Sequence, residues 1–533
     1  MTPDQTTAAS HASDDARYLA LKARDARFDG CFFTGVTSTG IYCRPVCSVK
    51  APKRENCRFF GLAAQAESAG FRPCLRCRPE LAPHSVVWSI QDASYILAHQ
   101  AARLLDEPEA WTGGSADSVP SVEKLAARLG VSDRHVRRIF EAQLGVSPVQ
   151  YLQTRRLLSA KQLLADTQLP ITQIALISGF ASVRRFNAAF ISHYHLNPTQ
   201  LRQRGAPVAG HGITVRLGYR PPYDVAAMLE FFIAHPLPGV EFIDQQALAP
   251  VLRRTLRIEA GEKIYTGWLA ATFDTERSQL LLEVSDSLCE VLPIVIRRVR
   301  AMFDLDADPK SINSALQTSF PHSDGLRVPG ALDGHELAVR AVLGQQVTVQ
   351  AGCRQAQRLV ARFGELIATP WPELNRLFPT PAALAAASSD DLGMLGIIRQ
   401  RQAAITGIAR AVLEKKLQLH GSADVLATVE TLKALPGIGD WTAQYIAMRA
   451  LRWPDAFPAG DVALHKALGV QGQKNPAKPA EAASLAWKPW RSYAVIRAWN
   501  GGWVDRKPTT ANPRHALPCK ATADTLIAVT STL

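Results

Sequence analysis

The sequence predicts a multidomain, mainly α-helical protein that begins with a small, cysteine-rich α+β domain. Three observations lead to this fold class. The chain has 533 residues, which is too long for one hydrophobic core. Cysteines cluster in the first eighty residues, while most of the chain after Ser89 repeats apolar residues at helical spacing. One segment of the second half alternates in the manner of strands, which adds a second small α+β domain.

The overall charge narrows the class of partner. Lys+Arg 60 against Asp+Glu 47 gives a formal net charge of +13, which favours a polyanion, nucleic acid before an anionic membrane. A merely basic enzyme is the alternative. The acidic first twenty residues lack the apolar core of a signal peptide, and no apolar window is long enough to span a membrane. Nine cysteines in such a chain indicate metal or thiol chemistry rather than disulfides.

Four cysteines have metal-ligand spacing. Cys43 and Cys47 form one close pair, and Cys74 and Cys77 form a second pair twenty-six residues later. Two such pairs can bring four sulfurs onto one tetrahedral Zn²⁺ ion. Two alternatives stay open, namely four buried free thiols and a zinc site with a purely structural role.

The residues around these cysteines suggest more than a structural site. Arg44, Arg72, Arg76 and Arg78 flank the two pairs. Thiolates on zinc remain nucleophilic, and arginines can hold a phosphate against them. The sequence therefore predicts a reactive sulfur beside a phosphate.

The segments "STGIYCRPVC" and "AGFRPCLRCRPE" resemble the metal-binding domain of the Ada DNA-repair family, over about Arg17 to Pro83. The resemblance implies that Cys43 accepts a methyl group from a DNA methylphosphotriester, with Cys47, Cys74 and Cys77 as the other zinc ligands. Methylation would remove a negative charge that faces the DNA backbone, so it should tighten DNA binding. The Pro-Cys-His-Arg active site with which that family often continues is absent from this sequence, so we expect no second methyltransferase.

Two helix-turn-helix patterns follow. One turns at Gly130 and the other at Gly179, each between helices with a shared apolar core. The second helices carry side chains suited to the major groove: Arg134, His135, Arg138, Arg184 and Arg185. A solvated arginine-rich face is the alternative for each of them. The segment resembles an AraC-type DNA-binding domain, which implies promoter DNA and RNA polymerase as partners.

In the second half, strand-like segments with turns near Gly261 and Ser278 precede a long helical region. Within that region "LPGIGDWTA" (Leu435–Ala443) separates two helices and places Gly437 and Gly439 around an apolar residue. This pattern predicts a helix-hairpin-helix, whose tight turn brings backbone amides to a DNA phosphate. Its carbonyl groups can also hold a monovalent cation.

An aspartate follows the hairpin at a defined distance. Asp461 lies twenty residues after Trp441, in "FPAGDVAL", where an isolated aspartate would be read as a helix N-cap. Together with "RPPYD" and "WKPWRSYAVIRAWNGGW", however, the region resembles AlkA-type 3-methyladenine DNA glycosylase II of the helix-hairpin-helix superfamily, over about residues 213–504. The alternative is a regulator in which this half only docks on DNA.

This second resemblance implies residue roles. Asp461 would stabilise the sugar cation, while Trp441, Tyr445 and Trp499 would hold the extruded base, although core packing is the alternative for each ring. Gln345 or Gln346 would fill the vacated stack. Trp441 stands where bifunctional relatives have a Schiff-base lysine, so we expect a monofunctional enzyme.

The expected organisation follows from these assignments. We expect a monomer in the bacterial cytoplasm, associated with the nucleoid, that binds alkylated and promoter double-stranded DNA. The predicted parts are a disordered N-terminus (1–16), a zinc domain (17–84), an AraC-type double helix-turn-helix (88–204), a linker (205–212), an AlkA-type α+β domain (213–325), an all-α helix-hairpin-helix domain (326–505) and a tail (506–533).

Overall fold

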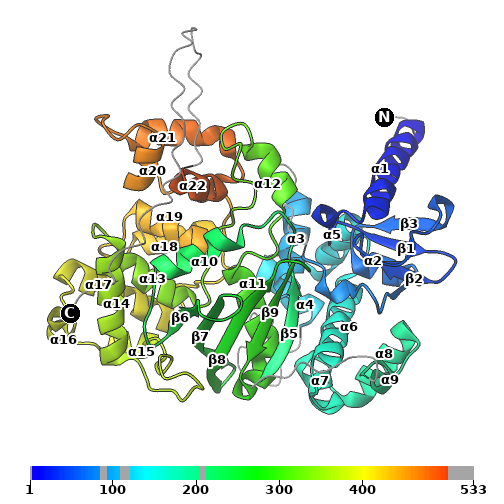
Figure 1. Ribbon diagram of the computed structural model, residues 1–533, viewed down its shortest axis with the longest axis horizontal. Helices are drawn as coiled ribbons and strands as arrows, with labels where there is room; N and C mark the ends of the chain where they lie inside the picture. The colour runs from blue at the N-terminus through cyan, green and yellow to red at the C-terminus, as the bar shows by residue number, and fades with distance from the viewer. Residues whose placement is uncertain (1–2, 85–92, 108–119, 203–211, 502–533) are drawn as a thin grey trace, which may run out of the picture.

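The computed structural model describes residues 3–84, 93–107, 120–202 and 212–501. It has the predicted multidomain, mainly helical architecture, with two small sheets. In Figure 1 the N-terminal elements lie on the right, the larger sheet lies in the lower centre, and the C-terminal helices cover the left side and the top. None of the helices in these ranges combines the length and the apolar character needed to cross a bilayer.

The N-terminal domain is built on a four-stranded sheet in the order β3-β1-β2-β4. Strands β1 and β2 form an antiparallel hairpin, β3 joins β1, and β4 runs parallel to β2. A short helix, α2, packs on this sheet and buries three alanines. The elements are α1 (Pro3–Ala23), β1 (Phe33–Val36), β2 (Ile41–Cys43), β3 (Cys57–Phe60), α2 (Ala63–Ser68) and β4 (Arg72–Pro73).

The N-terminus differs from its prediction. Residues 1–16 were expected to be disordered, but helix α1 begins at Pro3. The stretch is rich in alanine, the best helix former, and this propensity outweighs its polar composition. Asp15 of this helix also pairs with Arg54 at 2.8 Å, which ties α1 to the sheet domain that follows it.

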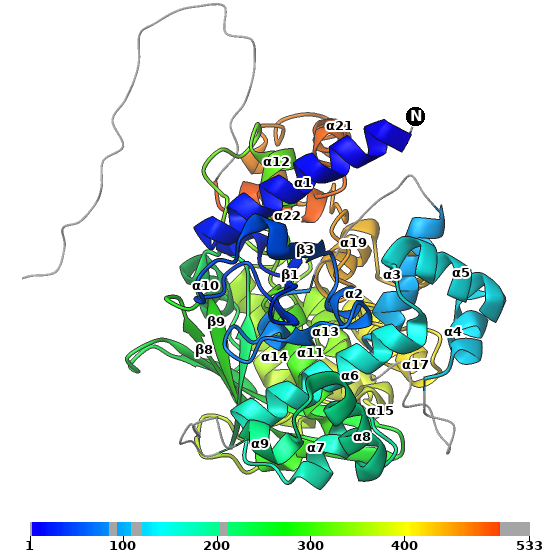
Figure 2. The same cartoon turned by 90° about the vertical axis from the view of Figure 1, so that its right-hand side faces the viewer.

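The next seven helices include the two predicted helix-turn-helix units, which are α4 with α5 and α7 with α8. Gly130 and Gly179 adopt positive φ at the two turns, as a tight reversal requires. Helix α6 lies between the units and keeps α5 and α8 well apart (Figure 2). The helices are α3 (Ala93–Leu105), α4 (Val122–Leu129), α5 (Asp133–Leu144), α6 (Pro148–Asp166), α7 (Ile171–Ile177), α8 (Val183–Tyr194) and α9 (Pro198–Arg202).

A five-stranded antiparallel sheet, in the order β5-β9-β8-β7-β6, forms the third domain. The alternation seen in the sequence becomes a buried face that packs against α10 and α11. The turn at Gly261, with φ 64°, joins β7 to β8 as predicted. The elements are β5 (Ile213–Gly218), α10 (Val225–Ala234), β6 (Glu241–Asp244), β7 (Val251–Ala260), β8 (Lys263–Asp274), β9 (Gln279–Val284), α11 (Leu292–Met302) and α12 (Pro309–Leu316).

The remaining helices share one large apolar core. Helices α18 and α19 flank the predicted hairpin, and α20 begins just after Asp461. The helices are α13 (Gly334–Leu343), α14 (Val349–Phe363), α15 (Pro381–Ala385), α16 (Ser389–Met394), α17 (Arg399–Leu413), α18 (Val425–Lys433), α19 (Asp440–Arg449), α20 (Val462–Ala467), α21 (Ala477–Ser484) and α22 (Arg491–Trp499).

Buried polar contacts join the first three domains. The fully buried Arg220, just after β5, donates hydrogen bonds to the carbonyl oxygens of Asp29 and Pro83 in the N-terminal domain. Asp166, at the end of α6, accepts from Arg78 at 2.6 Å and from Arg216 at 2.7 Å. The domains are therefore packed against one another. The predicted linker, except Gly212, and the predicted tail lie outside the described residues, so the domain boundaries remain predictions.

Candidate functional sites

The hairpin between α18 and α19 has the tight backbone turn that its glycines predict. Gly437 has φ 80°, and a Cβ atom there would approach the carbonyl oxygen of Gln400 to 3.0 Å. Gly439 is the N-cap of α19 and has no neighbour within 4 Å of the position of an added Cβ. The turn is therefore packed on its inner side and open on its outer side, where the first amides of α19 are free to meet an anion.

Asp461 has two roles in the structure. Its Oδ1 accepts from the backbone N–H of Leu464 at 2.7 Å, so it is the N-cap of α20. The same carboxylate accepts from the indole N–H of Trp441 at 2.9 Å and from that of Trp499 at 3.1 Å. Only 8% of the residue is exposed. The N-cap interpretation is therefore correct, and it coexists with a carboxylate held between two tryptophans.

A cavity of ≈ 490 Å³ opens beside this carboxylate. The rings of Trp441 and Tyr445 stack with centroids 5.3 Å apart and planes 16° apart, and Trp499 lies 6.4 Å from Tyr445. All three rings and Asp461 line the cavity. The structure thus brings together the four residues that the sequence assigned to base binding and catalysis.

Sequence reasoning missed the far wall of this cavity. Phe231 comes from α10 of the sheet domain, His235 directly follows that helix, and Arg449 comes from the last turn of α19. The His235 ring stacks on Phe231 at 4.2 Å, and burial lowers the pKa of His235 to about 4, so its ring is neutral at pH 7. The segment "FFIAH" shows only an apolar helix, and nothing in it indicates that the helix faces another domain.

The loop before α14 separates the two glutamines expected at the vacated base stack. The Gln345 side chain donates to the carbonyl oxygen of Gly437 and to Thr442, both at 2.9 Å, so it is fixed to the hairpin. Gln346 is exposed and has φ 52°, an unusual value for a residue with a side chain. Val347, 37% exposed, borders the cavity. Of the two glutamines, Gln346 is thus the one whose side chain lies at the surface.

The four predicted cysteine ligands lie together. One sulfur from each of Cys43, Cys47, Cys74 and Cys77 falls within 4.8 Å of the others, which fits thiolates around a single ion at the usual Zn–S distance of about 2.3 Å. Cys47 and Cys74 are buried, and Cys43 and Cys77 are partly exposed. The donor set is the one that Zn²⁺ prefers, and these residues form the zinc site of the protein.

Two arginines beside this site do not face outward as expected. Arg44 forms an ion pair with Asp29 and donates to the carbonyl oxygen of Cys77 at 3.0 Å. Arg78 pairs with Asp166, and with Glu80 at 2.9 Å. Both are used in contacts within the fold: Asp29 and Glu80 belong to the same domain as the arginines, and Asp166 comes from the end of α6. Arg76 is exposed and remains available to a phosphate.

The predicted major-groove side chains lie on the outer surface of the second helix of each unit. Arg134 and Arg138 of α5 are exposed, and His135 contacts Arg138 at 3.1 Å. Arg184 and Arg185, in the first turn of α8, are exposed as well. Their apolar neighbours on the same helices, such as Val136 and Phe186, are fully buried, so the two faces of each helix are clearly divided.

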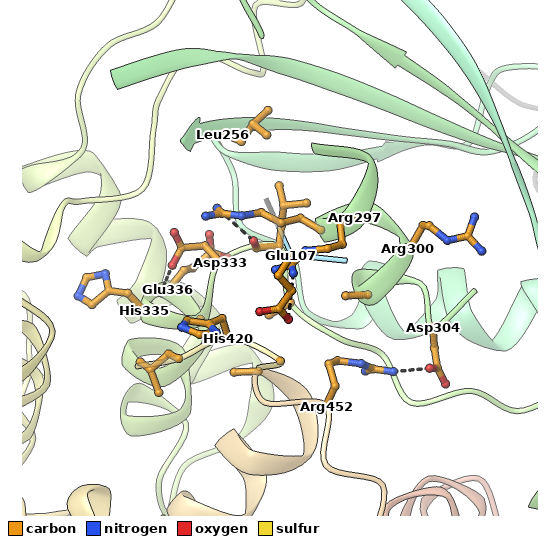
Figure 3. Close-up of a pocket in the computed structure, with 18 of the residues that line it drawn as sticks. Glu107, Leu256, Arg297, Arg300, Asp304, Asp333, His335, Glu336, His420 and Arg452 are labelled. Carbon is orange, nitrogen blue, oxygen red and sulfur yellow. Dashed lines mark hydrogen bonds and ion pairs between the residues drawn. The ribbon is translucent and has the colours of Figure 1, made fainter. Parts of the chain in front are cut away.

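A second cavity, ≈ 570 Å³, lies where α3, the sheet domain and the C-terminal helices meet (Figure 3). Opposite charges pair within it: Arg452 with Asp304, and Arg297 with Glu107 at 2.9 Å. Its charged side chains therefore serve contacts between domains.

A zinc site, two helix-turn-helix units and a hairpin beside an aromatic cavity define a DNA-binding protein of the repair class. Family models match all four parts: the metal binding domain of Ada (16–80), a helix-turn-helix domain (125–204), the AlkA N-terminal domain (214–333) and the HhH-GPD superfamily of base excision DNA repair proteins (339–492).

Known proteins resemble the chain at two scales. A Mycobacterium tuberculosis (strain CDC 1551 / Oshkosh) protein, "Probable bifunctional transcriptional activator/DNA repair enzyme AlkA", is 36% identical over 92% of this chain and 96% of its own length. The chain belongs to this family of fused Ada- and AlkA-type regulators and repair enzymes. Two Escherichia coli (strain K12) proteins match separate parts. "DNA-3-methyladenine glycosylase 2" is 35% identical over 54% of this chain and 97% of its own length. "Bifunctional transcriptional activator/DNA repair enzyme Ada" is 34% identical over 32% of this chain and 43% of its own length.

Proposed function

We propose that the C-terminal half hydrolyses the N-glycosidic bond of alkylated purines, 3-methyladenine among them. The observation that carries this proposal is the Asp461 carboxylate, which two indole N–H groups hold at the edge of an aromatic cavity. A methylated purine carries positive charge and leaves readily, so the enzyme needs to stabilise the sugar cation that remains. Electron-rich rings in the cavity favour the cationic base.

The residues divide this reaction among them. The C1′–N bond breaks and its electron pair leaves with the base, while Asp461 stabilises the positive charge on the sugar. A water oxygen then adds to C1′ and releases a proton to solvent. Backbone amides after Gly437 and Gly439 bind a backbone phosphate. A monovalent cation at the carbonyl oxygens of the same turn would assist this binding. The carbonyl oxygen of Gly437 already accepts a hydrogen bond from Gln345. Gln346 replaces the extruded base.

The glycosylase assay separates this proposal from a regulator that only docks on DNA. Purified protein is incubated with methylated duplex, and free 3-methyladenine is measured. We expect release by the parent protein and its loss in Asp461→Asn. A parent protein that binds the duplex and releases no base would favour the docking module.

We also propose that the enzyme is monofunctional. Trp441, whose indole bonds to Asp461, occupies the position at which a lyase needs an amine. The test follows DNA strand cleavage without added base after base release. We expect intact strands that carry abasic sites, and efficient nicking would contradict the assignment.

For the N-terminal domain we propose stoichiometric transfer of a methyl group from a DNA methylphosphotriester to Cys43. Cys43, Cys47, Cys74 and Cys77 would hold Zn²⁺, which would keep their sulfurs deprotonated. The partly exposed Cys43 sulfur attacks the methyl carbon, the S–C bond forms, the C–O bond breaks, and its electron pair restores the phosphate anion. Intact mass after exposure to methylated DNA should show one added methyl group, absent in Cys43→Ser. No added mass in the parent protein would leave Cys43 with a structural role.

The helix-turn-helix units supply the proposed output. The exposed arginines of α5 and α8 would read a promoter, and loss of negative charge at Cys43 would strengthen this binding and recruit RNA polymerase. We propose that the protein acts as a monomer at the bacterial nucleoid, in the cytoplasm. Promoter binding measured before and after methylation, at fixed salt, tests this; an unchanged affinity would contradict it.

A further inference from the structure

The aromatic cavity carries a positive charge behind its wall. Arg449 lies one helical turn after Tyr445 on α19 and is only 7% exposed. Its guanidinium donates to the carbonyl oxygens of Pro329, at 2.8 Å, and Gly330, at 3.2 Å, and to the hydroxyl oxygen of Tyr445. It also lies over the rings of Phe231, at 4.6 Å, and Tyr445, at 5.3 Å. No ion pair formed by the described residues includes Arg449.

This contact fixes the direction of the Tyr445 hydroxyl. A guanidinium has only N–H donors, so the phenol oxygen must accept from Arg449. The hydroxyl proton therefore points away from Arg449, and no other hydrogen bond to this hydroxyl occurs within the part of the chain that the structure describes. Because Tyr445 lines the cavity, this O–H is available to a bound base.

We propose that the Tyr445 hydroxyl is a catalytic hydrogen-bond donor for bases that leave without a positive charge, and that Arg449 is the positioning residue that aims it. This inference rests on the proposed glycosylase activity and deepens it. When the C1′–N bond of a neutral purine breaks, the electron pair leaves negative charge on the base, and a donor at the base stabilises that charge. A cationic methylpurine becomes neutral in the same step and needs no such donor.

The order of charges along the cavity supports the same conclusion. Asp461 bonds to Trp441, Trp441 stacks on Tyr445, and Tyr445 bonds to Arg449. A carboxylate thus stands at the sugar end of the stacked rings and a guanidinium at the opposite end. The field between them favours movement of electrons from the sugar to the base, the direction in which the bond must break.

The test compares a neutral and a cationic lesion. Single-turnover release of hypoxanthine and of 7-methylguanine from duplex DNA is measured for the full-length protein and for Tyr445→Phe, which keeps the stacked ring. We expect hypoxanthine release to fall roughly 30-fold or more, while 7-methylguanine release stays within about 3-fold. Arg449→Lys should lower hypoxanthine release by less than Arg449→Met does, since lysine can still donate to the phenol oxygen.

Controls separate this inference from the proposed function. Tyr493→Phe removes another buried tyrosine hydroxyl of the same helical domain, one bonded to Asp304 at 2.9 Å, and should change the two rates equally. Equal losses for both lesions in Tyr445→Phe, or no loss for hypoxanthine, would overturn the inference while the glycosylase stands. A parent protein that releases 7-methylguanine and no hypoxanthine would overturn it as well. A parent protein that releases neither of these bases would overturn the inference, and the proposed function would fall with it only if the same protein also released no 3-methyladenine.

Discussion

At the scale of single residues, Asp461 shows how one side chain satisfies a structural and a chemical demand together. It caps α20 through Oδ1 and receives both indole N–H groups of the cavity wall. The sequence predicted Asp461, Trp441 and Trp499 as separate site residues, and their spacing along the chain indicated the family to which they belong. It could not predict that the three side chains bond to one another, since this depends on how α19, α20 and α22 pack.

The two roles of Asp461 can be separated by Asp461→Asn. Asparagine caps helices as well as aspartate does, so the free energy of unfolding should change by less than about 1 kcal/mol. The amide carries no charge, so base release should fall roughly 100-fold or more. Asp424→Asn is the matched control, because Asp424 caps α18 in the same way, accepting from Ala427 at 3.0 Å, away from the cavity. Thermal melting and single-turnover assays of both variants check this, and a large loss of stability in Asp461→Asn alone would contradict the division.

At the scale of secondary-structure elements, the patterns that depend on local geometry were the predictable ones. The glycine turns, the strand alternation and the hairpin all follow from backbone preferences within a few residues. The contribution of α10 to the cavity was not predictable, because an apolar helix reads the same whichever domain covers it. The contacts of Arg44 with Asp29 and of Arg78 with Asp166 were missed for a related reason, since these partners lie 15 and 88 residues away along the chain. Glu80, the second partner of Arg78, is close in sequence.

The hairpin offers a paired prediction. Gly437→Ala forces a side chain to φ 80° and against Gln400, so it should lower the free energy of unfolding by roughly 1–3 kcal/mol. Gly439→Ala places its methyl group in open space with ordinary backbone angles, so stability should change by less than about 0.5 kcal/mol. That methyl group lies where DNA should approach, so affinity for duplex should still fall. Denaturant titrations and binding curves distinguish the two, and equal stability losses would show that the turn is not packed as described.

At the scale of the whole molecule, ion pairs with a buried carboxylate join the domains to one another, in addition to the covalent chain. Asp166 of α6 lies between Arg78 of the zinc domain and Arg216 of β5, and its side chain is fully buried. Gly218 of the sheet domain lies so close to Leu81 that a Cβ atom would come within 2.2 Å of its carbonyl oxygen. Composition gave no sign of this interface, since the residues that form it are ordinary charged and small residues in three separate segments.

Asp166→Asn tests this junction. The substitution leaves Arg78 and Arg216, both partly buried, without their shared carboxylate, while Arg78 keeps its ion pair with Glu80. It should therefore cost roughly 1–3 kcal/mol and should let the domains melt separately. Asp244→Asn is the control, since the Asp244–Arg253 pair is partly exposed and lies within one domain, so its loss should change the stability little. Calorimetry of both variants should show an altered transition for Asp166→Asn only. An unchanged melting profile would mean that the junction contributes little.

Acid should weaken the molecule over a defined range. Burial, together with Arg155, lowers the pKa of His84 to about 4, and burial lowers the pKa of His235 and His420 to about 4. In the unfolded chain a histidine has a pKa of about 6.5. Between these values the unfolded chain binds protons that the folded chain does not, so the free energy of unfolding falls as the pH drops from about 6.5 to about 4. Urea midpoints across this range check the slope, which His84→Gln should flatten.

The hydrogen bonds of Arg220 to Asp29 and Pro83 predict how the protein tolerates insertions between residues 203 and 211. Because Arg220 joins the zinc domain to the sheet domain through hydrogen bonds, we expect these contacts, and not the length of the chain between residues 203 and 211, to set the relative position of the two domains. A protein with extra glycine and serine residues inserted there should cover the same length of duplex DNA. If the covered length grew with each added residue, the connecting chain and not the hydrogen bonds would set the distance between the domains.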